Sequence, residues 1–219
     1  MNETRDLQRA AVYGSPPMTP NPNPAAPAPK KSGASVVIII IVVGLVLCCV
    51  VGMLAAIAIP NFVRFQARSK QAEVKVNLKS AYTAEMSFFS GENTYSDDIG
   101  KVGFSPSPGN RYLYAFSTEG ELAPAGGAGE GKSGVLADAA KYPGVDNDAL
   151  EKGVPAELWA ETGVQGKCPD ACSITIVGAG NVDTDSTVDV WSISTKDRTI
   201  NGQRVPAGQP YNHVNDLDE

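Results

Sequence analysis

The chain has 219 residues, with 18 Lys and Arg, 24 Asp and Glu and a single His, and its net charge is −6. Catalytic triads, multi-histidine zinc sites and most acid-base catalysis depend on histidine, so His213 alone gives little basis for an enzyme. Residues 91–219 carry 9 basic and 20 acidic residues, and this excess of negative charge argues against binding to nucleic acid. The sequence therefore predicts neither an enzyme nor a nucleic-acid-binding protein.

A proline-rich segment covers residues 1–35, which hold seven of the 16 prolines. Such a segment has too little apolar surface to offset the entropy lost on folding, so we predict a disordered tail. Proline-rich segments serve as spacers or as ligands of proline-binding domains. Binding of the tail to a cytoplasmic partner therefore stays open.

An apolar run covers residues 36–59, which are 24 residues without a charge. A helix of this length reaches about 36 Å, more than the roughly 30 Å of a bilayer's hydrocarbon core. The run is too long for the apolar part of a cleaved signal peptide, so we predict a transmembrane helix. Small residues recur every four positions and predict a face on which another helix packs closely: Gly44, Cys48, Gly52 and Ala56.

Helical character continues beyond the apolar run. Pro60 removes one backbone hydrogen bond and predicts a kink. Residues 61–89 contain neither Gly nor Pro, and their apolar residues fall near helical spacing. We therefore predict one long helix, transmembrane over 36–59 and amphipathic over 60–90.

Strand patterns occur in the remaining part, residues 91–219, which we expect to form a globular head. Alternating, β-branched or aromatic segments predict strands at residues 111–116, 172–177 and 187–194. The last two flank a turn-rich segment and predict an antiparallel hairpin, whereas residues 120–134 predict a surface loop and residues 201–219 show no periodicity. The expected fold class is α+β, with one long helix packed on a small antiparallel sheet.

The residues around Pro60 resemble those of a known family. Gly52 is followed by small and branched apolar residues and then by Ala-Ile-Pro-Asn-Phe, which ends at Phe62. This motif resembles the first helix of type IV pilins and pseudopilins, and residues 180–194 are similar to a pilin C-terminal hairpin. The resemblance implies a structural subunit that assembles with other pilin-like subunits through its N-terminal helix.

The leader motif of this family is not matched at the positions where the alignment to Pro60 would place it. Pilins of the family carry a basic leader that ends in Gly and a Glu at the fifth mature position, and counting back from Pro60 places these at Ile38 and Val43. The segment from Lys30 to Gly33 resembles a leader end at another position. Two functions therefore stay open: a subunit of a pilus or pseudopilus, and an unprocessed accessory or binding protein held permanently in the inner membrane.

The membrane topology of the chain decides in which compartment the cysteines of the head lie. Two basic residues lie shortly before the span and four lie after it, so the positive-inside rule alone does not fix the orientation. The resemblance implies a single pass through a bacterial inner membrane, with the N-terminus cytoplasmic and the head periplasmic or extracellular. In that compartment Cys168 and Cys172 favour a local disulfide, with two free thiols as the alternative.

An acidic segment separates the last two predicted strands. Counted from Asp183 as the first position of a loop, three aspartates lie at odd-numbered positions, as oxygen ligands do in calcium loops: Asp183, Asp185 and Asp189. The Gly and the bidentate Glu of such a loop are replaced by Val188 and Ser194. Calcium binding and an ordinary acidic turn are therefore the two interpretations, and no other cofactor is expected.

Overall fold

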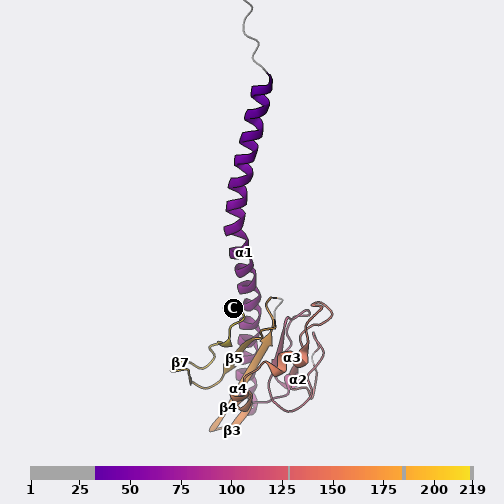
Figure 1. Cartoon of the computed structure of the whole chain (residues 1–219). Coiled ribbons are helices and arrows are strands. Elements are labelled where there is room, and N and C mark those ends of the chain that lie inside the picture. Colours follow the sequence, from indigo (N-terminus) through magenta and orange to yellow (C-terminus); the bar gives the residue numbers. More distant parts are fainter. Residues whose placement is uncertain (1–32, 128, 184–185, 218–219) are drawn as a thin grey trace, which may run out of the picture. The chain divides into compact units, whose positions relative to one another are not determined.

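The computed structural model describes residues 33–127, 129–183 and 186–217 (Figure 1). The chain divides into two compact units, Met1–Gly52 and Met53–Glu219. The boundary between them falls within helix α1, Gly33–Glu92. Of the proline-rich tail predicted at residues 1–35, only the last three residues belong to the described part.

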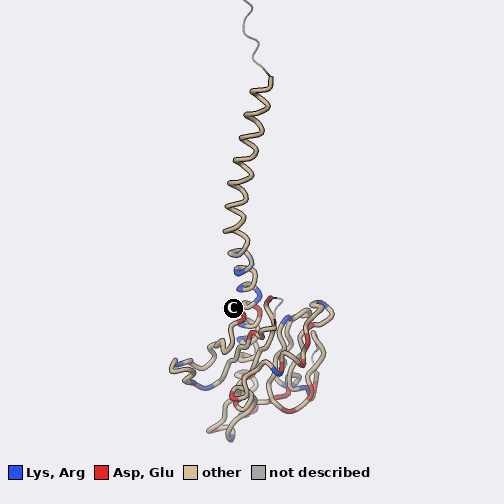
Figure 2. Tube along the Cα trace, in the orientation of Figure 1, with Lys and Arg blue, Asp and Glu red and all other residues tan. Residues whose placement is uncertain are grey.

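Helix α1 has 60 residues and includes Pro60. Its most apolar 18-residue window has a mean hydropathy of 3.4, and none of that window is buried within the described part of the chain. By length and composition α1 can therefore cross a membrane. Figure 2 shows Lys and Arg only in the second half of the helix, where the amphipathic pattern begins. The prediction of one long helix is confirmed.

Short helices and strands follow α1. The described residues of the head contain three helices, namely α2 (Ile99–Val102), α3 (Asn147–Lys152) and α4 (Ala156–Glu161). The strands are β1 (Tyr112–Ala115), β2 (Gly134–Val135), β3 (Gly163–Lys167), β4 (Ala171–Gly180), β5 (Asp189–Ser194), β6 (Arg198–Ile200), β7 (Gln203–Val205) and β8 (Tyr211–Val214). The fold is α+β, as predicted.

Six of these strands form one antiparallel sheet in the order β2-β1-β4-β5-β8, and β3 pairs with the first half of β4. Strands β4 and β5 pair from Thr175↔Ser194 to Gly180↔Asp189, so the predicted hairpin is confirmed. Strands β6 and β7 form a separate two-stranded sheet.

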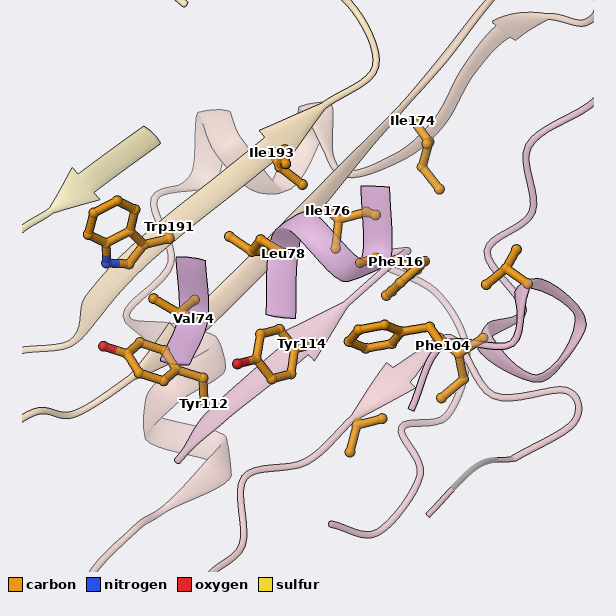
Figure 3. Close-up of a cluster of buried hydrophobic side chains, with 14 of the residues drawn as sticks. Val74, Leu78, Phe104, Tyr112, Tyr114, Phe116, Ile174, Ile176, Trp191 and Ile193 are labelled. Carbon is orange, nitrogen blue, oxygen red and sulfur yellow. The ribbon is translucent and has the colours of Figure 1, made fainter. Parts of the chain in front are cut away.

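Two hydrophobic clusters lie on opposite faces of the sheet, because alternate residues of a strand point to opposite sides. The cluster that α1 covers is shown in Figure 3 and includes Val74, Leu78, Phe104, Tyr112, Tyr114, Phe116, Ile174, Ile176, Trp191 and Ile193. The cluster that α3 and α4 cover includes Leu113, Leu150, Val154, Leu158, Val177 and Val190. Both faces of the central strands are therefore buried.

Helix α1 lies close to the sheet at a glycine of β4. A Cβ atom at Gly178 would lie 2.6 Å from a methyl carbon of Val74. This is well inside van der Waals contact, so any larger residue would push helix and strand apart. Gly178 is therefore required for the packing of α1 on the head.

Candidate assembly helix and carboxylate network

The second half of α1 has two faces of different character. One is buried against the sheet and contains Ala67, Gln71, Val74, Leu78, Ala81 and Glu85. The other is exposed and contains Phe65, Arg68, Ala72, Val76, Lys79 and Thr83. Both sets follow spacings of three and four residues, which place their members on one side of a helix. The head therefore covers one face of α1 and leaves the opposite face open.

The small residues of the first half of α1 are exposed as well. Gly44, Cys48, Gly52 and Ala56 are all exposed, and Cys48 is a free thiol. A Cβ atom at Gly44 or Gly52 would meet nothing within 4 Å among the described residues. Packing of another helix on this face and the kink at Pro60 both stay predictions.

The carboxylate of Asp189, at the start of β5, is fully buried and is surrounded by donors. Its Oδ1 accepts hydrogen bonds from Gln71 Nε2 and Asn212 Nδ2, each at 2.9 Å. Its Oδ2 accepts from the Tyr112 hydroxyl at 2.7 Å and from Trp191 Nε1 at 2.6 Å. These side chains belong to α1, β8, β1 and β5, so one carboxylate joins the helix to three strands of the sheet.

Two further features complete this network. The backbone N–H of Asp216 donates to Asp189 Oδ1 at 3.4 Å. Burial, together with the nearby Asp189 carboxylate, raises the pKa of the Tyr112 hydroxyl, which therefore keeps its proton and donates it. Burial of a carboxylate is tolerated when both of its oxygens are hydrogen-bonded, as they are here.

The predicted calcium ligands do not form one described site. Asp189 is committed to five protein donors, Asp183 is exposed, and Asp185 lies outside the described residues. Among the residues that the structure describes, no group of three His, Cys, Asp or Glu side chains is placed to hold a metal ion. Calcium binding stays a prediction.

The Cys168–Cys172 disulfide closes the turn between β3 and β4. Lys167 and Ala171, which flank this turn, are a paired position of β3 and β4. The sequence-based preference for a disulfide over two free thiols is confirmed. The bond therefore lies at the turn end of an edge hairpin, in which β3 is largely exposed.

Comparison with known proteins matches both the helix and the head. The family model of the type IV pilin PilA matches residues 65–189. The type IV major pilin protein PilA of Myxococcus xanthus (strain DK1622) is 36% identical over 206 aligned positions, which cover 79% of this chain and 89% of that protein. The chain belongs to the type IV pilin family. This is a family of structural subunits and not of enzymes.

This pilin has a second buried carboxylate, on the covered face of α1. Glu85 has no exposed surface, and its Oε2 accepts the backbone N–H of Ser96 at 3.3 Å. Its Oε1 has no hydrogen-bond partner among the described residues. Burial, and to a lesser extent the charge of Asp97, raises the pKa of Glu85 to about 8. The sequence contains one signal of this burial, because Glu85 follows Leu78 and Ala81 on the same helical face.

The single histidine of this pilin belongs to a third polar group. Ser192 Oγ lies 2.7 Å from His213 Nε2 and accepts a hydrogen bond from Arg198 Nη1 at 2.8 Å. Burial, followed by the charge of Arg198, lowers the pKa of His213 to about 4. Such an imidazole is a weak base at neutral pH, and Ser192 is fully buried. The serine and histidine therefore do not form a hydrolytic pair.

Proposed function

We propose that this pilin is a membrane-anchored subunit that assembles through its N-terminal helix into a pilus or pseudopilus. The observation that carries the proposal is the exposed apolar surface of α1. Every large apolar side chain from Val36 to Met53 that the structure describes exposes about half of its surface or more. So large an apolar area requires lipid or other helices around it.

The proposed topology follows from this anchor. Residues 36–59 span a bacterial inner membrane once, residues 60–90 continue the helix, and residues 91–219 form the head outside the cytoplasm. The Cys168–Cys172 disulfide supports an exported head, because disulfides persist in oxidising compartments. Residues 1–35 lie on the cytoplasmic side, where a partner of the proline-rich tail would be found.

Intact mass tests this function directly. Filaments sheared from the cell surface should contain this pilin, and its mass should show cleavage between Gly33 and Ile38. The membrane fraction serves as the reference, since it holds subunits that have not yet assembled. If the full-length mass is found in the membrane and the protein is absent from sheared filaments, the permanent inner-membrane accessory protein is the correct alternative.

We also propose that Gly44, Cys48, Gly52 and Ala56 form the surface on which neighbouring helices approach. Within a membrane, close packing between helices replaces contact with lipid, so small residues favour association. A larger side chain on this face should weaken association without hindering insertion.

Gly52→Leu provides the corresponding test. We expect membrane insertion to be unchanged, because leucine raises the apolarity of the segment, and helix-to-helix crosslinking to fall about fivefold. Val51→Leu lies off the small-residue face and is the matched control, with crosslinking close to wild type. If both variants crosslink equally well, the small residues reflect composition and not packing.

A further inference from the structure

The exposed face of α1 combines apolar and cationic side chains at a regular spacing. We call Ala72, Lys75, Val76 and Lys79 the outer face of α1. All four are exposed, and 67% of the Val76 surface is accessible. Ala72 and Val76 lie four residues apart, and so do Lys75 and Lys79, so the outer face presents an apolar row beside a cationic row.

The cationic row consists of Lys75 and Lys79. Neither lysine forms an ion pair within 4 Å among the described residues. The Lys75 ammonium lies 4.6 Å from the centroid of the Trp191 ring, which holds this side chain against the sheet. The outer face therefore offers two positive charges beside an apolar row that the head leaves exposed.

A cleft continues the outer face toward the head. It has a volume of about 460 Å³ and lies between Ala72 and Val76 on one side and Pro108 and Tyr142 on the other. Two more cations lie over the Tyr142 ring, Arg111 at 4.0 Å and Lys141 at 5.5 Å from its centroid. The cleft is also lined by Glu73, whose Oε1 accepts the backbone N–H of Arg111 at 2.7 Å, so cations outnumber carboxylates beside this part of α1.

Charge decides what can occupy this surface. Residues 60–90 carry a net charge of +3, whereas residues 91–219 carry −11. The second half of another α1 laid on the outer face would place lysine against lysine, and like charges oppose association, whereas the first half of α1 has no charge with which to pair the lysines. The head of a second copy would instead bring carboxylates to the lysines.

Helix α4 of the head has apolar and acidic rows that complement those of the outer face. Ala156 and Ala160 are exposed and lie four residues apart, as do the exposed Glu157 and Glu161. Neither glutamate forms an ion pair within 4 Å with any described residue. The apolar and charged rows of α4 therefore repeat at the same interval, about 6 Å, as those of the outer face. Rows of equal spacing interdigitate when two helices pack.

We propose that α4 of one copy docks on the outer face of α1 of a second copy, with Glu157 and Glu161 opposite Lys75 and Lys79. This proposal rests on the proposed function as a filament subunit. The two surfaces are different patches of one chain, so the contact is heterologous, and a docked pair keeps one free α4 on one copy and one free outer face on the other. A contact of this kind can repeat without closing, as an open filament requires.

Carbodiimide crosslinking of the full-length wild-type protein tests the contact without any substitution. A mixture of isotopically light and heavy chains is treated in membranes and in sheared filaments. We expect mass spectrometry to find Lys75 or Lys79 of one copy linked to Glu157 or Glu161 of another. If these links are missing from both fractions while other intermolecular links are present, the proposal is overturned.

Exchanging the charges of the lysines and glutamates provides a second test. We expect Lys75→Glu with Lys79→Glu to lower the yield of surface filaments about tenfold, and Glu157→Lys with Glu161→Lys to do the same. Combining all four substitutions should restore most of the yield, which a merely misfolded protein would not do. The control is Lys167→Glu with Lys196→Glu, two exposed lysines away from α1, and should leave the yield unchanged.

The outcomes separate this proposal from the proposed function. If the wild-type protein forms filaments and the combined variant assembles no better than either double variant, the docking contact is wrong and the subunit function stands. If the wild-type protein forms no filaments, the proposed function fails, and the crosslinks between copies in the membrane decide the docking contact alone.

Discussion

Replacing Asp189 with Asn is expected to lower the free energy of unfolding of the head by about 3 kcal/mol. The amide of asparagine places an NH₂ group, which only donates, where one carboxylate oxygen now accepts. On the Oδ2 side it would face the indole N–H of Trp191, which cannot accept. On the Oδ1 side it would face Gln71, whose amide N–H also donates to Asn215 Oδ1 at 2.9 Å. Either orientation leaves a buried donor without an acceptor.

Denaturant unfolding of the full chain in detergent measures this loss. Asp197→Asn is the matched control. Asp197 is an exposed carboxylate that accepts hydrogen bonds from Arg204 Nη2 at 2.7 Å and from the backbone N–H of Ala207 at 2.9 Å. Exposed charge pairs contribute at most about 1 kcal/mol, so the control should change little. Equal losses in the two variants would show that the buried network does not stabilise the head.

Glu85→Gln is expected to make the head more stable than wild type in alkaline solution. The fold raises the pKa of Glu85 from 4.5 to about 8, so folded protein retains this proton where unfolded protein loses it. The stability that Glu85 contributes is complete below about pH 4.5 and is lost as the pH rises to about 8, by roughly 5 kcal/mol. Glutamine does not titrate, so the free energy of unfolding of the variant should not show this decrease with pH.

Unfolding free energies at pH 5 and pH 9 test this expectation. Relative to wild type, Glu85→Gln should gain several kcal/mol on passing from the lower to the higher pH. Glu92→Gln, on the last turn of the same helix and fully exposed to solvent, is the control and should follow the wild-type curve. A parallel pH dependence of wild type and Glu85→Gln would mean that Glu85 is ionised in the folded head.

Elements with a local periodic pattern could be predicted from the sequence. Helix α1 follows from an uninterrupted apolar run and an amphipathic continuation, and β4 and β5 follow from alternating β-branched residues. Strands β3 and β8 lack such patterns. Four of the five residues of β3 are exposed, and all four residues of β8 are half-buried, so neither edge strand alternates between a buried and an exposed face. Their pairing with β4 and β5 is visible only in the folded chain.

The buried network could not be predicted, because its members lie far apart in sequence. Asp189 is separated from Gln71 by 118 residues and from Tyr112 by 77 residues. Its spacing from Asp183 and Asp185 instead suggests a loop that binds calcium. The disulfide, in contrast, joins cysteines only four residues apart, and it was predicted from this pair together with the exported compartment that the family resemblance implies.

The carboxylate network also sets an order of events during biosynthesis. Gln71 and Tyr112 are made early, but their acceptor comes with Asp189, and two further donors come with Asn212 and Asp216. The network therefore closes only after the ribosome has passed residue 216. Until then the amphipathic half of α1 lacks its main polar attachment to the sheet. The amphipathic half of α1 therefore completes its packing on the sheet late, when the described strands are available to pair.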